Sequence, residues 1–192
     1  MRLVVGMSGA TGAIYGIRLL QVLSQMRDVE THLVMSKWAE VTTSLETTYS
    51  VKDVRKLADA VYLGDQLTAP ISSGSFPVDA MVVVPCSMKA VASIRMGLSD
   101  NLLTRAADVT IKEQRKLILV PRETPLSQIH LENMLGLARM GAVILPPMPA
   151  FYLPLRSIDD VVDHTVARIL DQLKIPHALV ERWGGVCETP VD

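Results

Sequence analysis

The chain has 192 residues, of which 49% are hydrophobic but only 4% aromatic, and its formal net charge is −1. This length suits a single domain with an aliphatic core, and the balanced charge gives no electrostatic reason to expect nucleic acid or an anionic membrane as a partner. The apolar runs are shorter than the ~18 residues that span a bilayer, no segment resembles a signal peptide, and Cys86 and Cys187 form no disulfide framework, so we expect a cytoplasmic protein with reduced thiols.

The first half of the chain alternates apolar runs with helical patterns. Residues 3–5 predict a buried strand, and after a group of glycines Ile17, Leu20 and Leu23 form an apolar stripe at helical spacing. The elements expected next are a strand over 31–35, a helix over 38–45 and a helical stretch over 51–61.

The second half contains three strong strand signals, over 80–85, 117–121 and 142–147, and each run ends in proline. Such runs are typical of one parallel sheet that delivers its loops to a single edge. Helices are expected over 125–140, with Thr124 as N-cap, Pro125 at the first position and Gly141 after the last turn, and over 158–173. This order predicts an α/β fold with a doubly wound parallel sheet, as one domain over 1–183 followed by a tail over 184–192.

The glycines of "GMSGATGAIYG" follow the first strand and precede the first helix. Their spacing, from Gly6 through Gly9 and Gly12 to Gly16, differs from the dinucleotide fingerprint G-x-G-x-x-G. In this context backbone amides and the helix dipole receive a phosphate; the alternative is a tight turn without a ligand. Thr11 offers either a phosphate donor or a helix N-cap.

The end of the second strand distinguishes between nucleotide cofactors. An NAD enzyme carries Asp or Glu there to hold the ribose hydroxyls, whereas this chain has Ser36 and Lys37. A hydroxyl and an ammonium suit phosphate or carbonyl oxygens better than a ribose diol. We therefore expect FMN rather than NAD.

The loop "PCSMK" offers a second group of small polar side chains at a strand exit. Ser87 and Lys89 are suited to hold a cofactor. Cys86 is either a nucleophile or, as buried cysteines more often are, a packed thiol. The four histidines have no ligand spacing, so no metal site is expected.

Four cations lie among mainly apolar segments: Arg105, Lys112, Arg122 and Arg168. Each one alone is readily explained as an ordinary surface ion pair. Together at one sheet edge they would suit a small anionic substrate, most naturally a phosphate.

Several motifs resemble those of the UbiX-type flavin prenyltransferases, above all "VPRETPLSQIHLENML", together with "GMSGATGAIYG", "LVMSKWAE" and "DHTVARILDQL". The resemblance covers residues 2–183, and "PCSMK" and "SGSF" are similar to the branch that accompanies aromatic hydroxy-acid decarboxylases. It implies a flavodoxin-like, Rossmann-type fold and a homododecamer. It also implies transfer of a dimethylallyl group from dimethylallyl monophosphate to N5 and C6 of reduced FMN, giving prenylated FMN for a UbiD-type decarboxylase.

The resemblance also assigns roles to individual residues. FMN would be bound by Gly9, Ala10, Thr11, Ser36, Ser87, Met88, Lys89, Ala90 and Arg122. The prenyl phosphate would be bound by Tyr152 and Arg168, with Arg105 and Lys112 close to it, and the catalytic candidates are Glu46, Lys112 and Glu123. Thr11 stands where many relatives carry Ser, and Met88-Lys89 replaces a smaller pair of the ubiquinone branch.

Two alternatives stay open at this point. Flavin-dependent cysteine decarboxylases share the fold but use a histidine in the first half of the domain, where this chain has only His32, inside a strand. A non-catalytic FMN-binding subunit of a hydroxyarylic acid decarboxylase complex would have the same flavin site. The set Lys112, Tyr152 and Arg168 favours a transferase over such a subunit.

Overall fold

A six-stranded sheet forms the centre of the molecule, which we describe from a computed structural model over residues 1–153 and 155–185. All its strand pairs are parallel, in the order β3-β2-β1-β4-β5-β6. The strands are β1 (Arg2–Met7), β2 (Glu30–Met35), β3 (Ala60–Tyr62), β4 (Ala80–Cys86), β5 (Lys116–Pro121) and β6 (Val143–Ile144). The predicted doubly wound α/β fold is therefore confirmed.

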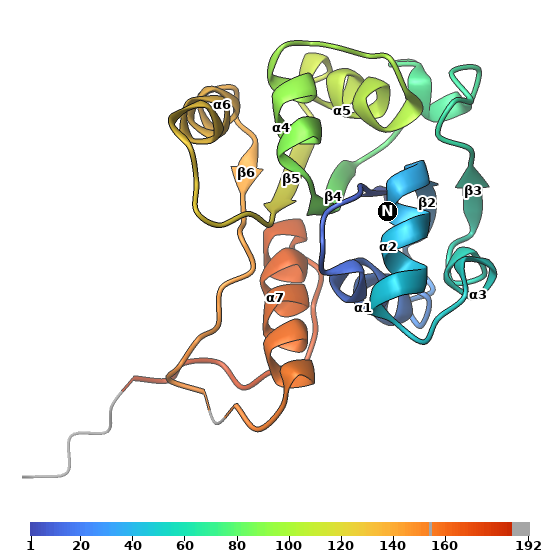
Figure 1. The fold of residues 1–192 in the computed structure, drawn as a ribbon. Coiled ribbons are helices and arrows are strands. Elements are labelled where there is room, and N and C mark those ends of the chain that lie inside the picture. The colour runs from blue at the N-terminus through green and yellow to red at the C-terminus, as the bar shows by residue number, and fades with distance from the viewer. Residues whose placement is uncertain (154, 186–192) are drawn as a thin grey trace, which may run out of the picture.

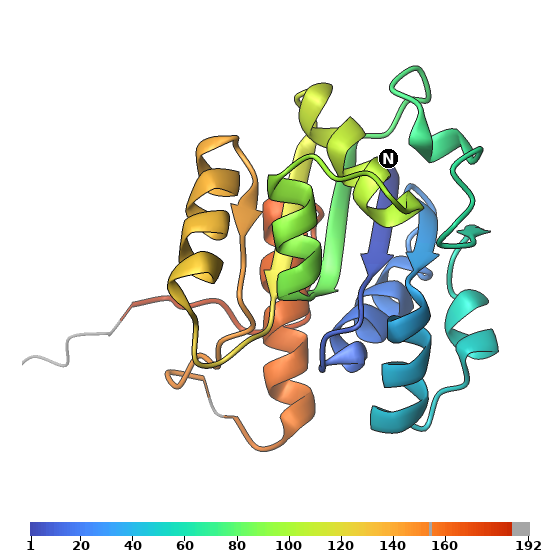
Figure 2. The same ribbon diagram turned by 45° about the horizontal axis from the view of Figure 1, so that its top comes forward.

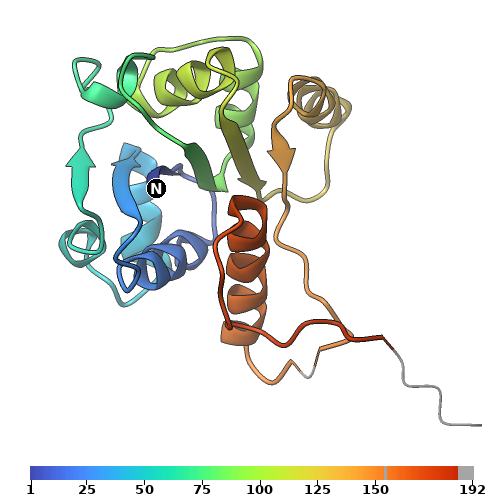
Figure 3. The same cartoon turned by 180° about the vertical axis from the view of Figure 1, so that it is seen from behind.

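Helices cover both faces of this sheet. They are α1 (Ala13–Leu23), α2 (Lys37–Glu46), α3 (Val51–Arg55), the 3-10 turn η1 (Pro70–Ser72), α4 (Met88–Arg95), α5 (Leu102–Lys112), α6 (Gln128–Arg139) and α7 (Ile158–Leu173). Figure 1 shows α4, α5 and α6 on one side of the sheet and α1 and α7 on the other, and the view from behind in Figure 3 agrees. In the described part of the chain, no helix is both long and apolar enough to cross a membrane.

Because both faces are covered, the central strands are apolar on both sides. Val5 and Val82 belong to a buried cluster with α1 and α7. Their neighbours Val4 and Val83 belong to the opposite cluster, with α4 and α5. Side chains alternate between the faces along each strand, so a run such as "AMVVVPC" is buried at every position.

The chain reverses its winding between β1 and β4, which are neighbours in the sheet. β1 leads into α1 on one face, whereas β4 leads into α4 on the other. Gly16 brings α1 close to this point, because a Cβ there would lie only 2.5 Å from the carbonyl oxygen of Val84. The loops after β1 and β4 therefore meet at the switch point, where doubly wound sheets bind ligands.

The structure corrects three predicted elements. The helix expected over 51–61 ends at Arg55 and is followed by β3, a three-residue edge strand too short for a readable alternation. The strand expected over 142–147 has only two residues paired with β5, Val143 and Ile144. The helix expected from Pro125 begins instead at Gln128.

The later start of α6 has a local cause. The side chain of Ser127 accepts a hydrogen bond from the amide of His130 at 3.3 Å, and the His130 ring accepts one from the Ser127 amide at the same distance. This reciprocal capping box makes Ser127 the N-cap instead of Thr124. Gly141, with φ of +92°, ends the helix as predicted.

The predicted domain over 1–183 and the tail from 184 stay predictions. Of the tail, residues 186–192 lie outside the described residues.

Candidate active site

A cavity of about 220 Å³ lies at the switch point of the sheet. Its lining comes from the loops after β1, β2 and β4 and from the starts of α4 and α5. The lining residues are Ser8, Gly9, Ser36, Trp38, Ser87, Lys89, Ala90, Ser93, Asn101, Leu103 and Thr104. Figure 2 shows β1, β2 and β4 pointing toward this same edge. The structure thus brings Gly9, Ser36, Ser87, Lys89 and Ala90 together at one cavity, and their role in binding FMN stays a prediction.

Three helices begin at this cavity, each with a side-chain cap. Ser36 caps α2 by accepting from the Ala39 amide at 3.1 Å, and Ser87 caps α4 by accepting from the Ala90 amide at 3.2 Å. The side chain of Asn101 caps α5. Helix N-termini carry partial positive charge and outward-directed amides. Together with the ammonium of Lys89, they make the cavity suited to an anion.

The glycine loop lies against α2. A Cβ on Gly9 would come within 2.2 Å of the Cβ of Trp38, so only glycine permits this approach of the backbone. The N-cap of α1 is Gly12, with φ of +97° and no side-chain cap, so Thr11 is not the N-cap and is exposed. Whether Thr11 donates to a phosphate stays a prediction.

Glu46, at the end of α2, supplies the missing cap of α1. Its Oε2 accepts hydrogen bonds from the amides of Gly12 at 2.8 Å and Ala13 at 3.2 Å. The first amides of α1 therefore bind this carboxylate. The cavity is lined by N-terminal residues of α2, α4 and α5, and by none of α1.

Ser8 joins the two central loops. Its hydroxyl donates to the carbonyl of Pro85 at 3.0 Å and accepts from the amide of Ser87 at 2.7 Å. The sequence pattern does not single out Ser8, Trp38, Asn101 or Thr104, although a polar residue directly after a buried strand, as in "VVGMSG", is a usable signal for Ser8.

Cys86 ends β4 but does not reach the cavity as a nucleophile. Its side chain is fully buried, and this burial raises the pKa of the thiol to about 12. Almost no thiolate exists at neutral pH, and the thiolate is the reactive form. The packed-thiol interpretation of Cys86 therefore holds.

Arg122 and Glu123 follow β5 at the same edge of the sheet. The Arg122 amide donates to the carbonyl of Cys86 at 3.4 Å, which ties this loop to the end of β4. Burial raises the pKa of Tyr15 on α1, and the positive charge of Arg122 partly opposes this rise. A Glu123 carboxylate oxygen accepts from the Thr124 amide at 3.1 Å.

Tyr152 and Arg168 lie on a second group of elements, away from the cavity-lining loops. The Tyr152 ring makes edge contacts with Trp183, at 5.2 Å between centroids, and with His164, at 6.5 Å. Arg168, one turn after His164 on α7, pairs with Asp171 at 2.6 Å. Figure 1 shows the segments before and after α7 extending together from one end of the molecule.

Arg105 and Lys112 lie on α5 and do not join either group within one subunit. Arg105 donates to the carbonyl of Ser72 at 3.0 Å and to Asp108 at 2.9 Å. Lys112, in the last turn of α5, pairs with Glu113 beside Gly74. That end of α5 lies at the amino edge of the sheet, opposite the cavity, because β5 starts there.

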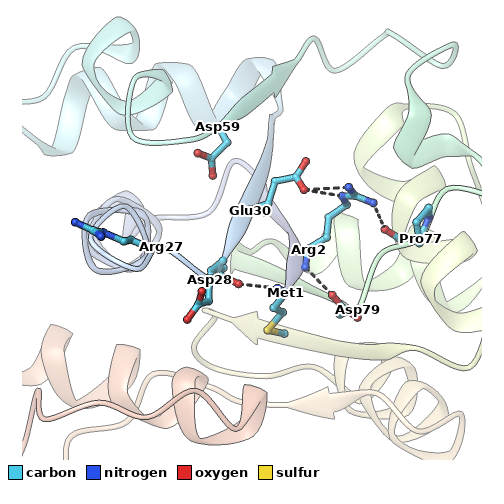
Figure 4. A pocket seen from close by; sticks show the side chains of 9 residues that line it. Met1, Arg2, Arg27, Asp28, Glu30, Asp59, Pro77 and Asp79 are labelled. Carbon is cyan, nitrogen blue, oxygen red and sulfur yellow. Dashed lines mark hydrogen bonds and ion pairs between the residues drawn. The ribbon is translucent and has the colours of Figure 1, made fainter.

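A larger cavity, of about 460 Å³, lies at this amino edge (Figure 4) and contains none of the predicted site residues. Its charges largely pair with one another. Arg2 binds Glu30 at 3.0 Å, and the Arg2 amide donates to Asp79 at 2.6 Å. In the ranges 1–153 and 155–185, no group of three His, Cys, Asp or Glu side chains is placed to hold a metal ion.

The chain is similar to known flavoproteins over almost its whole length. The family model described as Flavoprotein matches residues 1–170. A "Probable UbiX-like flavin prenyltransferase" of Streptomyces sp. (strain D7) is 59% identical over 186 residues, which are 97% of this chain and 93% of that protein. A dodecameric FMN-dependent UbiX-like decarboxylase from Escherichia coli O157:H7 superposes with a TM-score of 0.95 at 59% identity, covering 96% of this chain and 100% of that chain. AnUbiX (PadA1), solved in complex with FMN and dimethylallyl pyrophosphate, superposes with a TM-score of 0.94 at 55% identity, covering 96% and 98%.

Proposed function

Because this chain belongs to the UbiX-like flavin prenyltransferases, within the Flavoprotein family, we propose that it transfers a dimethylallyl group from dimethylallyl monophosphate to reduced FMN. The observation that carries the proposal is the convergence of three helix N-termini on one cavity at the switch point. The product is FMN prenylated at N5 and C6.

The cavity is suited to the phosphate end of FMN. Its polar side chains are hydroxyls, an amide, an ammonium and the indole of Trp38, and the lining residues that the structure describes include no carboxylate. Gly9 lines the cavity, and its lack of a Cβ lets the glycine loop lie directly against Trp38 on α2. We assign the phosphate to the starts of α2, α4 and α5 with Lys89, and the rest of the flavin to Gly9–Thr11, Met88 and Arg122.

Bound FMN would supply the electron-rich ring atoms that attack the allylic carbon. The protein's part is to hold the donor and to stabilise the charge that develops on its leaving phosphate. We assign this to Arg168 and Tyr152, assisted by Arg105 and Lys112, because guanidinium and ammonium groups form strong charge-assisted hydrogen bonds with phosphate. Glu123, beside Arg122, is the proposed acceptor of the proton lost from C6. Glu46, the other candidate carboxylate, is held against the glycine loop.

We propose that the complete site forms between copies of the chain. Within one subunit the cations lie on α5, on the β5 exit loop and on α7, in three separate places. Large apolar side chains are exposed on α6 and in the segment between β6 and α7: Ile129 is 68% exposed, Leu135 51% and Phe151 87%. Such apolar surface is typical of subunit contacts, and the similar E. coli O157:H7 protein is dodecameric. Light scattering at micromolar concentration should therefore give a mass well above that of a dimer.

The use of the product by a UbiD-type aromatic acid decarboxylase and a location in the cytoplasm are further parts of the proposal. Both rest on the family and on the sequence. A test of the first is transfer of the flavin product to an apo-decarboxylase of that type, read as recovery of its activity.

The decisive experiment incubates the purified protein with reduced FMN and dimethylallyl monophosphate and weighs the flavin by mass spectrometry. A transferase adds one dimethylallyl unit to the flavin. An FMN-binding subunit without activity would return unmodified FMN, which would refute the proposal. The cysteine decarboxylase alternative is disfavoured because His32 is buried in β2, where it contacts Tyr62 and Glu30 at 2.9 and 3.0 Å.

A further inference from the structure

Asp171, near the end of α7, binds three cationic or basic side chains with one carboxylate. Its Oδ2 accepts a hydrogen bond from Nη1 of Arg168 at 2.6 Å. Its Oδ1 accepts from Nη2 of Arg182 at 2.7 Å and lies 3.1 Å from Nε2 of His177. The Asp171 and His177 side chains are only 18% and 3% exposed, whereas those of Arg168 and Arg182 are 51% and 64% exposed.

These three partners connect different parts of the chain. Arg168 belongs to the same helix as Asp171, whereas His177 and Arg182 belong to the segment that follows α7. The His177 side chain is 3% exposed, which shows that this segment is packed onto the helix at this point. Directly after Arg182, the ring of Trp183 contacts that of Tyr152. The Asp171 carboxylate thus binds Arg168 directly and also holds the segment whose Trp183 packs against Tyr152. Arg168 and Tyr152 are the two residues assigned to the prenyl donor.

We propose that Asp171 is a positioning residue for the donor site, holding Arg168 for the phosphate and fastening the segment that carries Arg182 and Trp183. This inference rests on the proposed function, in which Arg168 binds the donor. Two guanidinium groups share one carboxylate, so the cluster keeps a net positive charge for an anion. Arg168 is still 51% exposed, so much of its side chain remains accessible to a ligand.

The pairing differs from an ordinary surface ion pair. Burial acts to raise the pKa of Asp171, but hydrogen bonds from Arg182 and His177 and the charges of Arg182 and Arg168 outweigh it and hold the pKa below its usual range. Asp163, also on α7, provides a contrast: its carboxylate binds Arg18 on α1 at 2.6 and 3.1 Å and makes no hydrogen bond to Arg168. Asp163 is therefore a matched control on the same helix.

The test compares Asp171→Ala, Asp171→Asn, Asp163→Ala and Arg168→Ala with the unmodified protein. For each, kcat and KM for dimethylallyl monophosphate are measured, together with inhibition by inorganic phosphate, FMN affinity and thermal unfolding. Phosphate inhibition reports donor-site binding without turnover. FMN affinity and unfolding report the integrity of the fold.

Asp171→Ala should raise the donor KM and weaken phosphate inhibition by about tenfold or more, the size expected for one misplaced charge-assisted hydrogen bond. FMN affinity should be unchanged. Asp171→Asn keeps one acceptor oxygen and should recover part of the loss, which also provides a result if the Ala variant does not fold. Asp163→Ala should lower stability without changing the donor KM.

Two results distinguish a failure of the proposal for Asp171 from a failure of the assignment of Arg168 to the donor phosphate. If Arg168→Ala leaves donor KM and phosphate inhibition unchanged, Arg168 does not bind the donor and the proposed function loses that residue. If Arg168→Ala weakens donor binding but both Asp171 variants bind donor and phosphate normally, Asp171 is structural only and the inference is wrong.

Discussion

The carboxylate of Glu46 stabilises the start of α1, and Glu46→Ala should lower the stability of the protein. The side chain accepts from two amides, of Gly12 and Ala13, at 2.8 and 3.2 Å. Loss of a helix cap costs about 0.5–2 kcal/mol, and loss of negative charge at a helix N-terminus about 0.3–1 kcal/mol more. Since about 1 kcal/mol changes Tm by roughly 2–4 °C in a chain of this size, a loss of about 2 kcal/mol corresponds to roughly 6 °C.

Thermal unfolding without flavin, at a fixed subunit concentration, measures this change. Glu40→Ala is the matched control, because Glu40 lies on the same helix and its pair with Arg55 joins two side chains that are each 36% exposed. An exposed pair of this kind contributes about 0–1 kcal/mol. If Glu46→Ala melts at the temperature of the unmodified protein, or no lower than Glu40→Ala, the capping role is refuted.

Three other predictions follow from the site and its surroundings. FMN should bind more tightly than NAD in fluorescence titrations, because Ser36 stands where NAD enzymes carry an acid; tighter NAD binding would contradict the cavity assignment. Cys86→Ala should still make prenylated FMN, because a thiol with a pKa of about 12 supplies almost no nucleophile at neutral pH; loss of product with FMN still bound, seen by mass spectrometry, would reverse that conclusion. The backbone amide of Thr31 lowers the pKa of Asp59 below its ordinary value of 3.8, although burial opposes it. The carboxylate therefore stabilises the fold above about pH 4, and this contribution is lost as the pH falls through the lowered pKa. As the pH falls below about 4, the difference in urea midpoint between the unmodified protein and Asp59→Asn should shrink. A difference that does not change with pH would show that the charge of Asp59 makes no contribution to stability.

The sheet was predictable because its strands are buried on both faces. The uninterrupted apolar run of β4 and the bounds of α7 could be identified from local pattern alone. β3 could not, because it pairs with β2 through only three residues and its strand character depends on that neighbour. The start of α6 was missed because Thr124-Pro125 and Ser127 both offer start signals, and only the reciprocal bond with His130 decides between them.

The meeting of the loops after β1, β2 and β4 at one cavity was predictable for a topological reason, since loops that follow adjacent parallel strands meet at one edge. The positions of the residues proposed for the donor were not. Residue type and resemblance group Lys112 with Arg168, and nothing in the periodicity indicates that neither of them lines the cavity of its own subunit. The role of Asp171 was equally invisible, because two of its partners lie in a segment without regular secondary structure.

The residues that line the switch-point cavity extend from Ser8 to Thr104 along the chain. Slightly more than the first half of the protein therefore has to be synthesised before the cavity can form. Until β4 pairs with β1, the glycine loop has no opposite wall, and Ser8 has no Pro85 carbonyl to bind. Flavin bound at this junction stabilises only chains in which β4 has already paired with β1. Supply of FMN in the cell should thus favour the accumulation of folded subunits, in addition to providing the acceptor for the reaction.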